Sequence, residues 1–426
     1  MTTLVIGAAI SGRAATRLLR SQGEKVIVYD ADPGALVGVD ADLTHGGSWD
    51  PSLLDGVDLV VPSPGVPEHA PPVAAAIAAG LTVWSELELG YRNVGLPILA
   101  VTATNGKTTV TEIAALMLNA SGLRAAAVGN IGEPLSGVDP RDWDVLVVEA
   151  SSFQLRFVDT FHATVAVLLN IAPDHFDWHL TMAAYVAAKQ RVLERQTPDD
   201  IVVFDADDPG AVAAVSSASA RLVPVSATRV PDGGWGVNGG VLTVGAAAIP
   251  LASMHRSDAA FVIDVAAAAA GAFHLGANPS AVERVAVTYR PGKHRRQIVG
   301  SWNGVTWIDD SKATNPHAAL AAIRAYPSVV LIAGGRAKGL DVTPLAAESN
   351  VRAIVAIGEA APVLAAASPR TIVAASLEEA VAIADGIAQD GDTILLAPGC
   401  ASFDMFQSYA ERGDRFASAV HSRKGS

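Results

Sequence analysis

The sequence is poor in cysteine and in positive charge. A single cysteine, Cys400, stands among 426 residues, which excludes an internal disulfide and fits a reducing compartment. The net charge is −13. A protein that neutralises many nucleic-acid phosphates needs a broad basic face, so nucleic acid is excluded as a partner. Any phosphorylated ligand must instead meet positive charge concentrated in a pocket.

The sequence also lacks a long apolar run. The alanine-rich stretch Val265–Phe273 is far shorter than the ~20 residues that span a bilayer. Met1 leads directly into TTLVIGAAISG, which has no basic targeting region and predicts a first strand and turn. We therefore expect a cytoplasmic protein without a membrane partner.

The composition that is present favours a globular α/β protein. Half of the residues are hydrophobic and 17% are charged. Strand-like apolar runs alternate with alanine-rich helical stretches, which favours largely parallel sheets in two or three domains. The segments Tyr91–Pro97 and Tyr289–Lys293, each of which precedes a new strand, predict three consecutive α/β domains, residues 1–92, 93–289 and 290–426. The glycine-rich segment Val230–Pro250 predicts a small hairpin excursion within the middle one.

Individual elements follow from the same alternation. A helix is expected over Arg13–Ser21 and a helical segment over Met182–Arg195. The main expected strands are Leu4–Ile6, Lys25–Tyr29, Pro97–Val101, Val145–Val148, Val165–Leu169, Val305–Ile308, Val329–Ala333, Ala353–Ile357 and Thr393–Leu396.

The string TATNGKTT follows one of these strands and precedes a helical pattern. It supplies Thr104, Asn105, Gly106, Lys107, Thr108 and Thr109. Backbone N–H groups at a helix start cradle phosphate, Lys107 adds a point charge and the Thr108 hydroxyl reaches Mg²⁺. Val101 stands where the strict phosphate-loop pattern has its first glycine. The alternative is a capped helix start without a ligand.

Two further strand ends carry groups suited to a second cation. Glu149 follows Val145–Val148, and Asp174, His175 and Asp177 follow Val165–Leu169. Carboxyl ends of parallel strands meet at one sheet edge, so we expect Glu149 and His175 to meet near the phosphate loop. A histidine satisfied by loop backbone is the alternative. Lys189, on an ordinary helical segment, is expected to be a solvated surface lysine.

Four more segments stand out. DDSKATN places carboxylates, a lysine, hydroxyls and an amide at the end of Val305–Ile308. Upstream, Arg295 or Arg296 of the basic cluster Lys293–Arg296 is expected to face a nucleotide or a phosphoryl group; a basic interdomain linker is the alternative. The first turn, GAAISG, departs from the dinucleotide pattern, which argues against NAD. Ser63-Pro-Gly65 is a second candidate turn for an anion.

Taken in order, ASSFQL, NIAPDHFDWH, YVAAKQRVL, DDSKATNPHA and APGCASFDMFQSYAERG resemble the motifs of the Mur ligase family over nearly the whole chain. The string DDSKATN is similar to a motif of the branch of this family that adds D-glutamate to UDP-N-acetylmuramoyl-L-alanine. The resemblance implies a Rossmann-like amino-terminal domain for the UDP end, a central P-loop ATPase-like domain and a Rossmann-like carboxy-terminal domain for the amino acid. It also implies a bacterial monomer that uses ATP and two Mg²⁺ ions in peptidoglycan precursor synthesis through an acyl phosphate.

The resemblance implies residue roles as well. Catalytic roles fall on Lys107, His175, Lys189, Lys312 and Lys338. ATP contacts fall on residues 104–109 with Asp264, Arg295 and Asp310. Substrate contacts fall on Ile10, Ser11, Asp30, Ser63, Gly65, Asn130, Ser151, Gln154, Thr314, Ser402 and Tyr409. Metal ligands fall on Thr108, Glu149, His175 and Lys189, the last as its carbamate.

The chain departs from the family pattern at several positions. Ala103 replaces a glycine, Asp32 a basic residue and Gln297 a glutamate, and the usual His-Asn-x-x-Asn is missing, with Asp264 at its second asparagine. Three alternatives remain: a folylpolyglutamate synthase-like enzyme, a user of L-glutamate, and a catalytically inactive binding protein. DDSKATN argues against the first, and the presence of Lys107, Glu149, His175 and Lys189 argues against the last.

Overall fold

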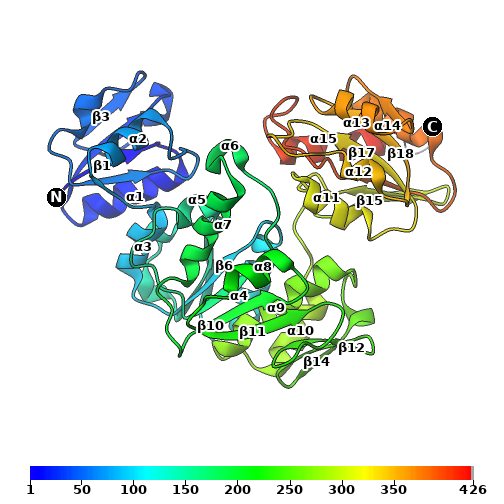
Figure 1. The fold of residues 1–426 in the computed structure, drawn as a ribbon, viewed down its shortest axis with the longest axis horizontal. Coiled ribbons are helices and arrows are strands. Elements are labelled where there is room, and N and C mark those ends of the chain that lie inside the picture. The colour runs from blue at the N-terminus through cyan, green and yellow to red at the C-terminus, as the bar shows by residue number, and fades with distance from the viewer. Residues whose placement is uncertain (424–426) are drawn as a thin grey trace. The chain divides into compact units, whose positions relative to one another are not determined.

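The computed structural model describes residues 1–423 and contains three sheets that follow one another along the chain (Figure 1). The chain forms two compact units. The first joins Met1–Ile171 with Trp178–Tyr289, and the second joins Ala172–Asp177 with the chain from Arg290 onward. The three-domain α/β architecture is confirmed, since each of the ranges 1–92, 93–289 and 290–426 contains one sheet; their boundaries stay a prediction.

The amino-terminal sheet is entirely parallel, in the order β3-β2-β1-β4-β5. Its three central strands, β2, β1 and β4, are largely buried apolar runs, as parallel strands covered on both faces require, whereas the edge strands β3 and β5 are more exposed. The elements are β1 (Thr2–Ile6), α1 (Ile10–Ser21), β2 (Lys25–Asp30), β3 (Leu43–Gly46), β4 (Leu59–Pro62), α2 (Pro71–Ala78), β5 (Thr82–Val83) and α3 (Glu86–Val94).

The central sheet has nine strands in the order β14-β13-β12-β11-β10-β9-β6-β8-β7. Its strands are β6 (Ile98–Thr102), β7 (Ala125–Gly129), β8 (Val145–Glu149), β9 (Val165–Leu168), β10 (Ile201–Asp205), β11 (Arg221–Ser226), β12 (Trp235–Asn238), β13 (Val241–Val244) and β14 (Ala247–Pro250). The helices of this region are α4 (Lys107–Ala120), α5 (Ser152–Leu155), α6 (Phe176–His179), α7 (Met182–Gln190), α8 (Pro209–Val215), α9 (Ala259–His274) and α10 (Pro279–Thr288).

Two local expectations are corrected here. The hairpin within residues 230–250 is present, but β12 pairs with β11, so these strands extend the central sheet and are not an excursion from it. The helix expected to reach Arg195 ends as α7 at Gln190. A 3₁₀ turn over Arg191–Leu193 follows, because the tighter turn brings Val192 and Leu193 into the core.

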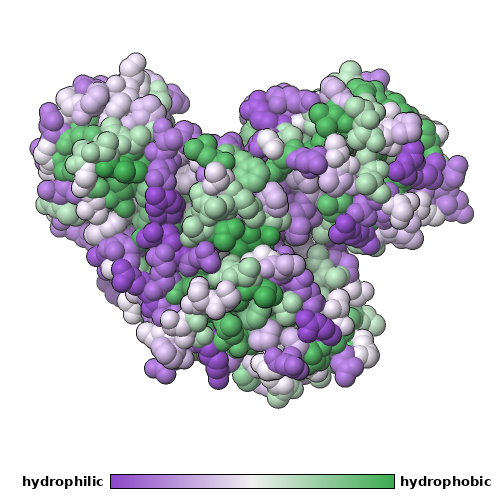
Figure 2. Space-filling view, viewed as in Figure 1, coloured by the Kyte–Doolittle hydropathy of each residue, from purple (hydrophilic) through white to green (hydrophobic). Residues whose placement is uncertain are grey.

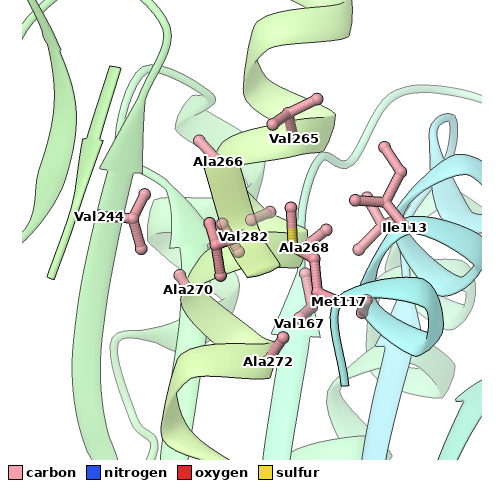
Figure 3. Packing of buried hydrophobic residues seen from close by; sticks show 14 of the residues in the cluster. Ile113, Met117, Val167, Val244, Val265, Ala266, Ala268, Ala270, Ala272 and Val282 are labelled. Carbon is pink, nitrogen blue, oxygen red and sulfur yellow. The ribbon is translucent and has the colours of Figure 1, made fainter. Parts of the chain in front are cut away.

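The alanine-rich run lies inside the first unit as part of α9. Residues 265–270 are fully buried, and small side chains let the helix approach both α4 and the sheet closely. Figure 3 shows Ile113 and Met117 of α4 with Val167 and Val244 of the sheet around this helix. None of the helices in residues 1–423 is both long and apolar enough to cross a membrane.

The carboxy-terminal sheet has the order β15-β16-β20-β17-β18-β19, and its pairs are parallel apart from the antiparallel β15·β16 edge. The elements are β15 (Gln297–Trp302), β16 (Val305–Asp309), α11 (Pro316–Ile323), β17 (Val329–Gly334), α12 (Pro344–Ala347), β18 (Val351–Ile357), α13 (Ala361–Ala367), β19 (Thr371–Val373), α14 (Leu377–Ile387), β20 (Thr393–Leu396) and α15 (Tyr409–Ser422). On the face shown in Figure 2, polar and apolar residues are interspersed over both units.

Candidate active site

The phosphate loop joins β6 to α4 and is held by its own unit. Gly106 adopts a positive φ of 89° and precedes the first helical residue, Lys107. Asn170, at the end of β9, accepts the Asn105 N–H at 2.9 Å and donates to the Asn105 carbonyl at 3.0 Å. The Thr104 N–H donates to the Asn170 carbonyl, and the Thr104 hydroxyl lies 2.9 Å from the Tyr185 hydroxyl. The loop is therefore shaped before any ligand arrives.

Lys107 lies over this loop. Its Nζ donates to the carbonyl oxygens of Ala103, at 2.7 Å, and Thr104, at 3.0 Å. These backbone acceptors keep the ammonium at the helix start, where a phosphate would meet both its charge and the helix N–H groups. Thr108 is half-buried beside it, and Thr109 is buried.

Asp264 lies directly against the loop. A Cβ built on Gly106 would come 2.3 Å from Asp264 Oδ1, a distance that no side chain tolerates. Asp264 is half-buried on a helix that is otherwise buried from Phe261 to Ala272. Gly106 is therefore required both by its backbone conformation and by this approach, and the predicted ATP residues 104–109 and Asp264 come together.

Lys189 is not the solvated surface lysine that its local sequence indicates. It is 1% exposed, and its Nζ donates to the Ala103 carbonyl at 2.7 Å. The Thr102 hydroxyl lies 3.3 Å away, and the Tyr185 ring centroid 4.7 Å away. The expectation was wrong because α7 turns this residue toward the carboxyl end of β6, which the helical periodicity of a segment of ordinary composition does not reveal. Lys107 and Lys189 therefore share one backbone acceptor.

Glu149 lies at the same sheet edge, because β8 pairs with β6 and Glu149 is in register with Val101. The carboxylate is buried, and its Oε1 accepts from Asn130 Nδ2 at 2.7 Å. Its Oε2 is buried with no hydrogen-bond partner within residues 1–423. An unpaired buried carboxylate oxygen is costly, so it suits a cation ligand.

The donors at this edge fit Mg²⁺ better than a transition metal. Residues 1–423 contain no group of three or more His, Cys, Asp or Glu side chains arranged to hold a metal ion. A carboxylate oxygen at this edge and a threonine hydroxyl at the start of α4 suit a Mg²⁺ ion that keeps water and phosphate oxygens as its other ligands.

His175 belongs to the second unit together with the rest of Ala172–Asp177, whereas Glu149 and Lys189 belong to the first. The predicted meeting of His175 with Glu149 stays a prediction. Within the second unit, the buried Asp174 accepts from Asn315 Nδ2 at 2.8 Å and lies 3.4 Å from Lys338 Nζ. Burial acts to raise the pKa of Asp174, but the charges of His175 and Lys338 and the Asn315 hydrogen bond hold it below its usual value.

DDSKATN forms the loop between β16 and α11. Asp309 is buried and 2.6 Å from His294 Nδ1, and Asp310 accepts the Arg296 N–H at 3.0 Å. Arg296 is 9% exposed with its Nε 3.8 Å from Asp310, whereas Arg295 is half-buried, so Arg296 is the more deeply buried of the two arginines.

Arg412 of α15 holds the other side of this loop. It is fully buried and donates to the Ser311 hydroxyl, the Ser311 carbonyl and the Cys400 carbonyl. Burial lowers its pKa to about 10 and raises that of the buried Cys400 thiol to about 12. Lys312 Nζ lies 3.9 Å from the Tyr409 ring centroid. Lys312, Arg412 and Tyr409 thus tie DDSKATN to the segment that follows β20.

The remaining amino-acid candidates lie in the same unit. Thr314 is half-buried and its N–H donates to the Lys312 carbonyl at 2.8 Å. Ser402 is 2% exposed and its carbonyl accepts from Met405 and Phe406. Both sit in loops that leave the carboxyl ends of β16 and β20, which are neighbouring parallel strands.

The amino-terminal turn joins β1 to α1. Gly7 has a φ of 94°, and a Cβ on Gly12 would come 1.8 Å from the Gly7 carbonyl oxygen. Asp30 accepts the Ala8 N–H at 2.7 Å, and the Ser63 hydroxyl donates to the Gly7 carbonyl at 3.2 Å. Asp30 and Ser63 therefore meet at one turn.

The other candidates of this turn are more open. Ile10 is 73% exposed and Ser11 is half-buried. Gly65 has no atom within 4 Å of its built Cβ. An exposed isoleucine beside a glycine turn leaves apolar surface for a ligand.

Ser151 and Gln154 form a capping box at the start of α5. The Ser151 N–H and hydroxyl both donate to Gln154 Oε1, at 3.0 and 2.8 Å. Both side chains are buried, so in this structure they hold the segment after Glu149, and their substrate contacts stay a prediction.

Sequence reasoning missed Asn170, Tyr185 and Arg412 as site residues. Asn170 was visible only as the first residue after a strand, which is the sheet edge where ligands bind. Tyr185 lies one helical turn before Lys189, and that spacing was the available signal. Arg412 gave no signal, because an arginine on an amphipathic terminal helix ordinarily faces solvent.

The chain matches three family models. Residues 1–85 match the Mur ligase MurD-like N-terminal domain, residues 101–230 the Mur ligase middle domain, and residues 294–400 the Mur ligase glutamate ligase domain. It is 41% identical to the UDP-N-acetylmuramoylalanine–D-glutamate ligase of Frankia casuarinae, over 100% of this chain and 95% of that one. It is 39% identical to the enzyme of the same name from Mycobacterium avium, over 98% and 96% of the two chains.

Solved structures share the fold at low identity. A pseudomurein peptide ligase type C from Methanothermus fervidus aligns with a TM-score of 0.63 and 19% identity, covering 99% of both chains. UDP-N-acetylmuramate-alanine ligase MurC from Thermotoga maritima aligns with a TM-score of 0.59 and 16% identity, covering 99% of both. MurF ligase from Thermotoga maritima, in complex with ADP, aligns with a TM-score of 0.58, covering 87% of this chain and 91% of that one.

Proposed function

The chain belongs to the Mur ligase family, and we propose that it joins D-glutamate to UDP-N-acetylmuramoyl-L-alanine at the expense of ATP in peptidoglycan precursor synthesis. The observation that carries the proposal is the edge of the central sheet. A braced phosphate loop with Lys107 stands there one strand away from Glu149, whose Oε2 has no partner. Relatives that bear this activity in their names cover the chain from end to end.

The reaction proceeds through an acyl phosphate. The ATP γ-phosphate rests on the N–H groups at the start of α4 and against Lys107, which neutralises charge as the phosphoryl group moves. The alanyl carboxylate of the UDP-linked substrate attacks this phosphate, the bond between the β- and γ-phosphates breaks and ADP leaves. The neutral amine of D-glutamate then attacks the acyl carbon and loses a proton, and inorganic phosphate leaves from the tetrahedral intermediate.

Thr108 and Glu149 would hold one Mg²⁺, which supplies charge stabilisation to the transferring phosphoryl group. His175 and the carbamate of Lys189 would hold a second. Carbamylation converts a buried cation into a carboxylate-like anion, and the burial of Lys189 at the phosphate loop supports this role. Asp264, Arg295 and Asp310 complete the ATP contacts.

The amino-terminal domain binds the UDP end of one substrate, and the carboxy-terminal domain binds the amino acid. Ile10, Ser11, Asp30, Ser63 and Gly65 contact the UDP end, and Asn130, Ser151 and Gln154 contact the sugar-phosphate part. Lys312, Thr314, Lys338, Ser402 and Tyr409 surround the amino acid. The enzyme acts as a monomer in the bacterial cytoplasm, where ATP and the UDP-linked precursor are available.

The test is an ADP-release assay with the full chain, Mg²⁺ and ATP. ADP release should require both UDP-N-acetylmuramoyl-L-alanine and D-glutamate, and a panel of amino acids including L-glutamate should give far slower release. Release with another amino acid and none with D-glutamate would reject the proposal. Glu149→Gln keeps an acceptor for Asn130 and should raise the Mg²⁺ concentration that gives half-maximal rate about 10- to 100-fold.

A further inference from the structure

The segment Ala172–Asp177 places one buried carboxylate beside the candidate amino-acid site. It follows β9 in the chain but packs with the second unit. Asp174 is 3% exposed, although its neighbours Pro173 and Asp177 are exposed. Asp174 is therefore the carboxylate that the segment buries, whereas that of Asp177 is exposed.

Asn315 fixes the position of that carboxylate. The Asn315 Oδ1 caps α11 by accepting the Ala318 N–H at 2.9 Å, which leaves its Nδ2 to donate to Asp174 Oδ2 at 2.8 Å. The His175 N–H donates to the other oxygen, Oδ1, at 2.8 Å. Two short hydrogen bonds thus hold Asp174 independently of any lysine.

The contact with Lys338 is of a different kind. Lys338 Nζ lies 3.4 Å from Asp174 Oδ1, which is longer than the ~2.7–2.9 Å of a strong charge-assisted hydrogen bond. The Lys338 side chain is 15% exposed, and its backbone adopts a left-handed φ of 54°. The ammonium is thus held near the carboxylate, with donor capacity left for a ligand.

A carboxylate and an ammonium side by side are complementary to an α-amino acid, which carries one group of each sign on the same carbon atom. We propose that Asp174 and Lys338 bind two oppositely charged groups of the incoming amino acid. Lys338 binds a carboxylate and Asp174 binds the α-amino group. The ion pair seen in the structure opens when the zwitterion enters between its members. Asp174 is then the residue that selects ligands with an amino group.

This inference rests on the proposed function, because it takes Lys338 as part of the amino-acid site. It adds that the enzyme recognises the amino group of this substrate before the reaction begins. A dicarboxylic acid without an amino group, such as glutarate, keeps the partner of Lys338 and lacks the partner of Asp174.

The test measures the dissociation constants of D-glutamate and glutarate by calorimetry on the full chain, with UDP-N-acetylmuramoyl-L-alanine and a non-hydrolysable ATP analogue present. Asp174→Asn keeps an oxygen for Asn315 and removes the charge. It should raise the dissociation constant of D-glutamate about 10- to 100-fold, the range expected for a lost hydrogen bond to a charged group. The dissociation constant of glutarate should change by less than about twofold. Lys338→Ala should weaken both ligands.

The matched control is Asp177→Asn, which makes the same chemical change on an exposed residue of the same segment. It should move neither constant. Equal weakening of both ligands by Asp174→Asn would assign a purely structural role and overturn the inference, as would an unchanged affinity for D-glutamate. Wild-type ADP release with D-glutamate tests the proposed function separately; if another amino acid is the substrate, that acid and its deamino analogue replace the pair.

Discussion

The first compact unit contains two strand–turn–helix segments that both present the start of a helix to a ligand, but they are built differently. β1 leads through Gly7 into α1, and β6 leads through Gly106 into α4. Neither helix has a side-chain N-cap, since Ala9 and Gly106 stand at the cap positions. Several other helices begin at a capping residue, such as Thr181, Asp258 or Asn278. Both turns thus leave backbone N–H groups for a ligand.

The difference lies in the cation at each turn. The phosphate loop is braced by side chains from other elements, Asn170 and Tyr185, and carries a lysine. The amino-terminal turn is also held by side chains of other elements, Asp30 on the Ala8 N–H and Ser63 on the Gly7 carbonyl, and Gly12 packs closely against that carbonyl. Lys107 places a cation on the phosphate loop itself, whereas Arg13, the cation beside the amino-terminal turn, donates to the carbonyls of Ala8, Ala35 and Val37.

The largest effect expected from this comparison is that of Lys107→Ala. Removing the cation from the phosphate loop should lower kcat about 1,000-fold or more, because the charge on the transferring phosphoryl group loses its partner. ADP release measures the loss. Affinity for the UDP-linked substrate, measured by calorimetry, should not change, since that ligand rests on the other turn. Unchanged activity would remove the phosphate loop from the mechanism.

Gly12→Ala should give the next largest effect, on the other turn. The new Cβ would meet the Gly7 carbonyl oxygen at 1.8 Å, so the backbone must move. We expect a loss of about 1–3 kcal/mol in the free energy of unfolding, measured by denaturant titration, and weaker binding of the UDP-linked substrate. Nucleotide binding to the phosphate loop should be retained. Equally weakened ATP binding would show that a change at one turn is transmitted to the other.

Asn170→Ala should have a smaller effect confined to the phosphate loop. It removes two hydrogen bonds to Asn105, at 2.9 and 3.0 Å, each worth about 1 kcal/mol. The KM for ATP should rise about 10-fold with little change in the KM for D-glutamate. Initial rates at varied ATP measure this. A change in both KM values would mean that Asn170 supports more than the loop.

The smallest effect, and of opposite sign, is expected at Gly386. This exposed glycine lies in α14 with no atom within 4 Å of a built Cβ, and its φ is in the ordinary helical range. Gly386→Ala should raise the free energy of unfolding by about 0.5–1 kcal/mol. The variant shows that a loss at Gly12 comes from the turn and not from the exchange of glycine for alanine.

The sequence predicts the phosphate loop well because its signal is local. A strand, a glycine with a positive φ and a lysine follow one another within a few residues, and the structure places all of them as expected. The strands that surround it, such as Val145–Glu149 and Val329–Gly334, were also predictable from continuous apolar runs. Here the physical cause of the structure lies within each segment.

Lys189, Asp174 and Arg412 show where prediction fails. Each is a charged residue on a segment of ordinary composition, and each is buried. Their burial depends on hydrogen-bond partners from far along the chain: the Ala103 carbonyl accepts from Lys189, Asn315 donates to Asp174, and Ser311 accepts from Arg412. Such partners are fixed by tertiary packing, so local periodicity assigns these charges to the surface.

The burial of Cys400 has a practical consequence. It is the one cysteine of the chain, fully buried, with a pKa raised by burial to about 12, so its thiolate is scarce at neutral pH. Thiol-reactive probes should therefore not react with the native protein. Cysteines introduced at exposed positions, one in each compact unit, become the sole attachment points for a pair of spectroscopic labels. The distance between the two units can then be followed in solution as each substrate is added, with no need to remove a native thiol first.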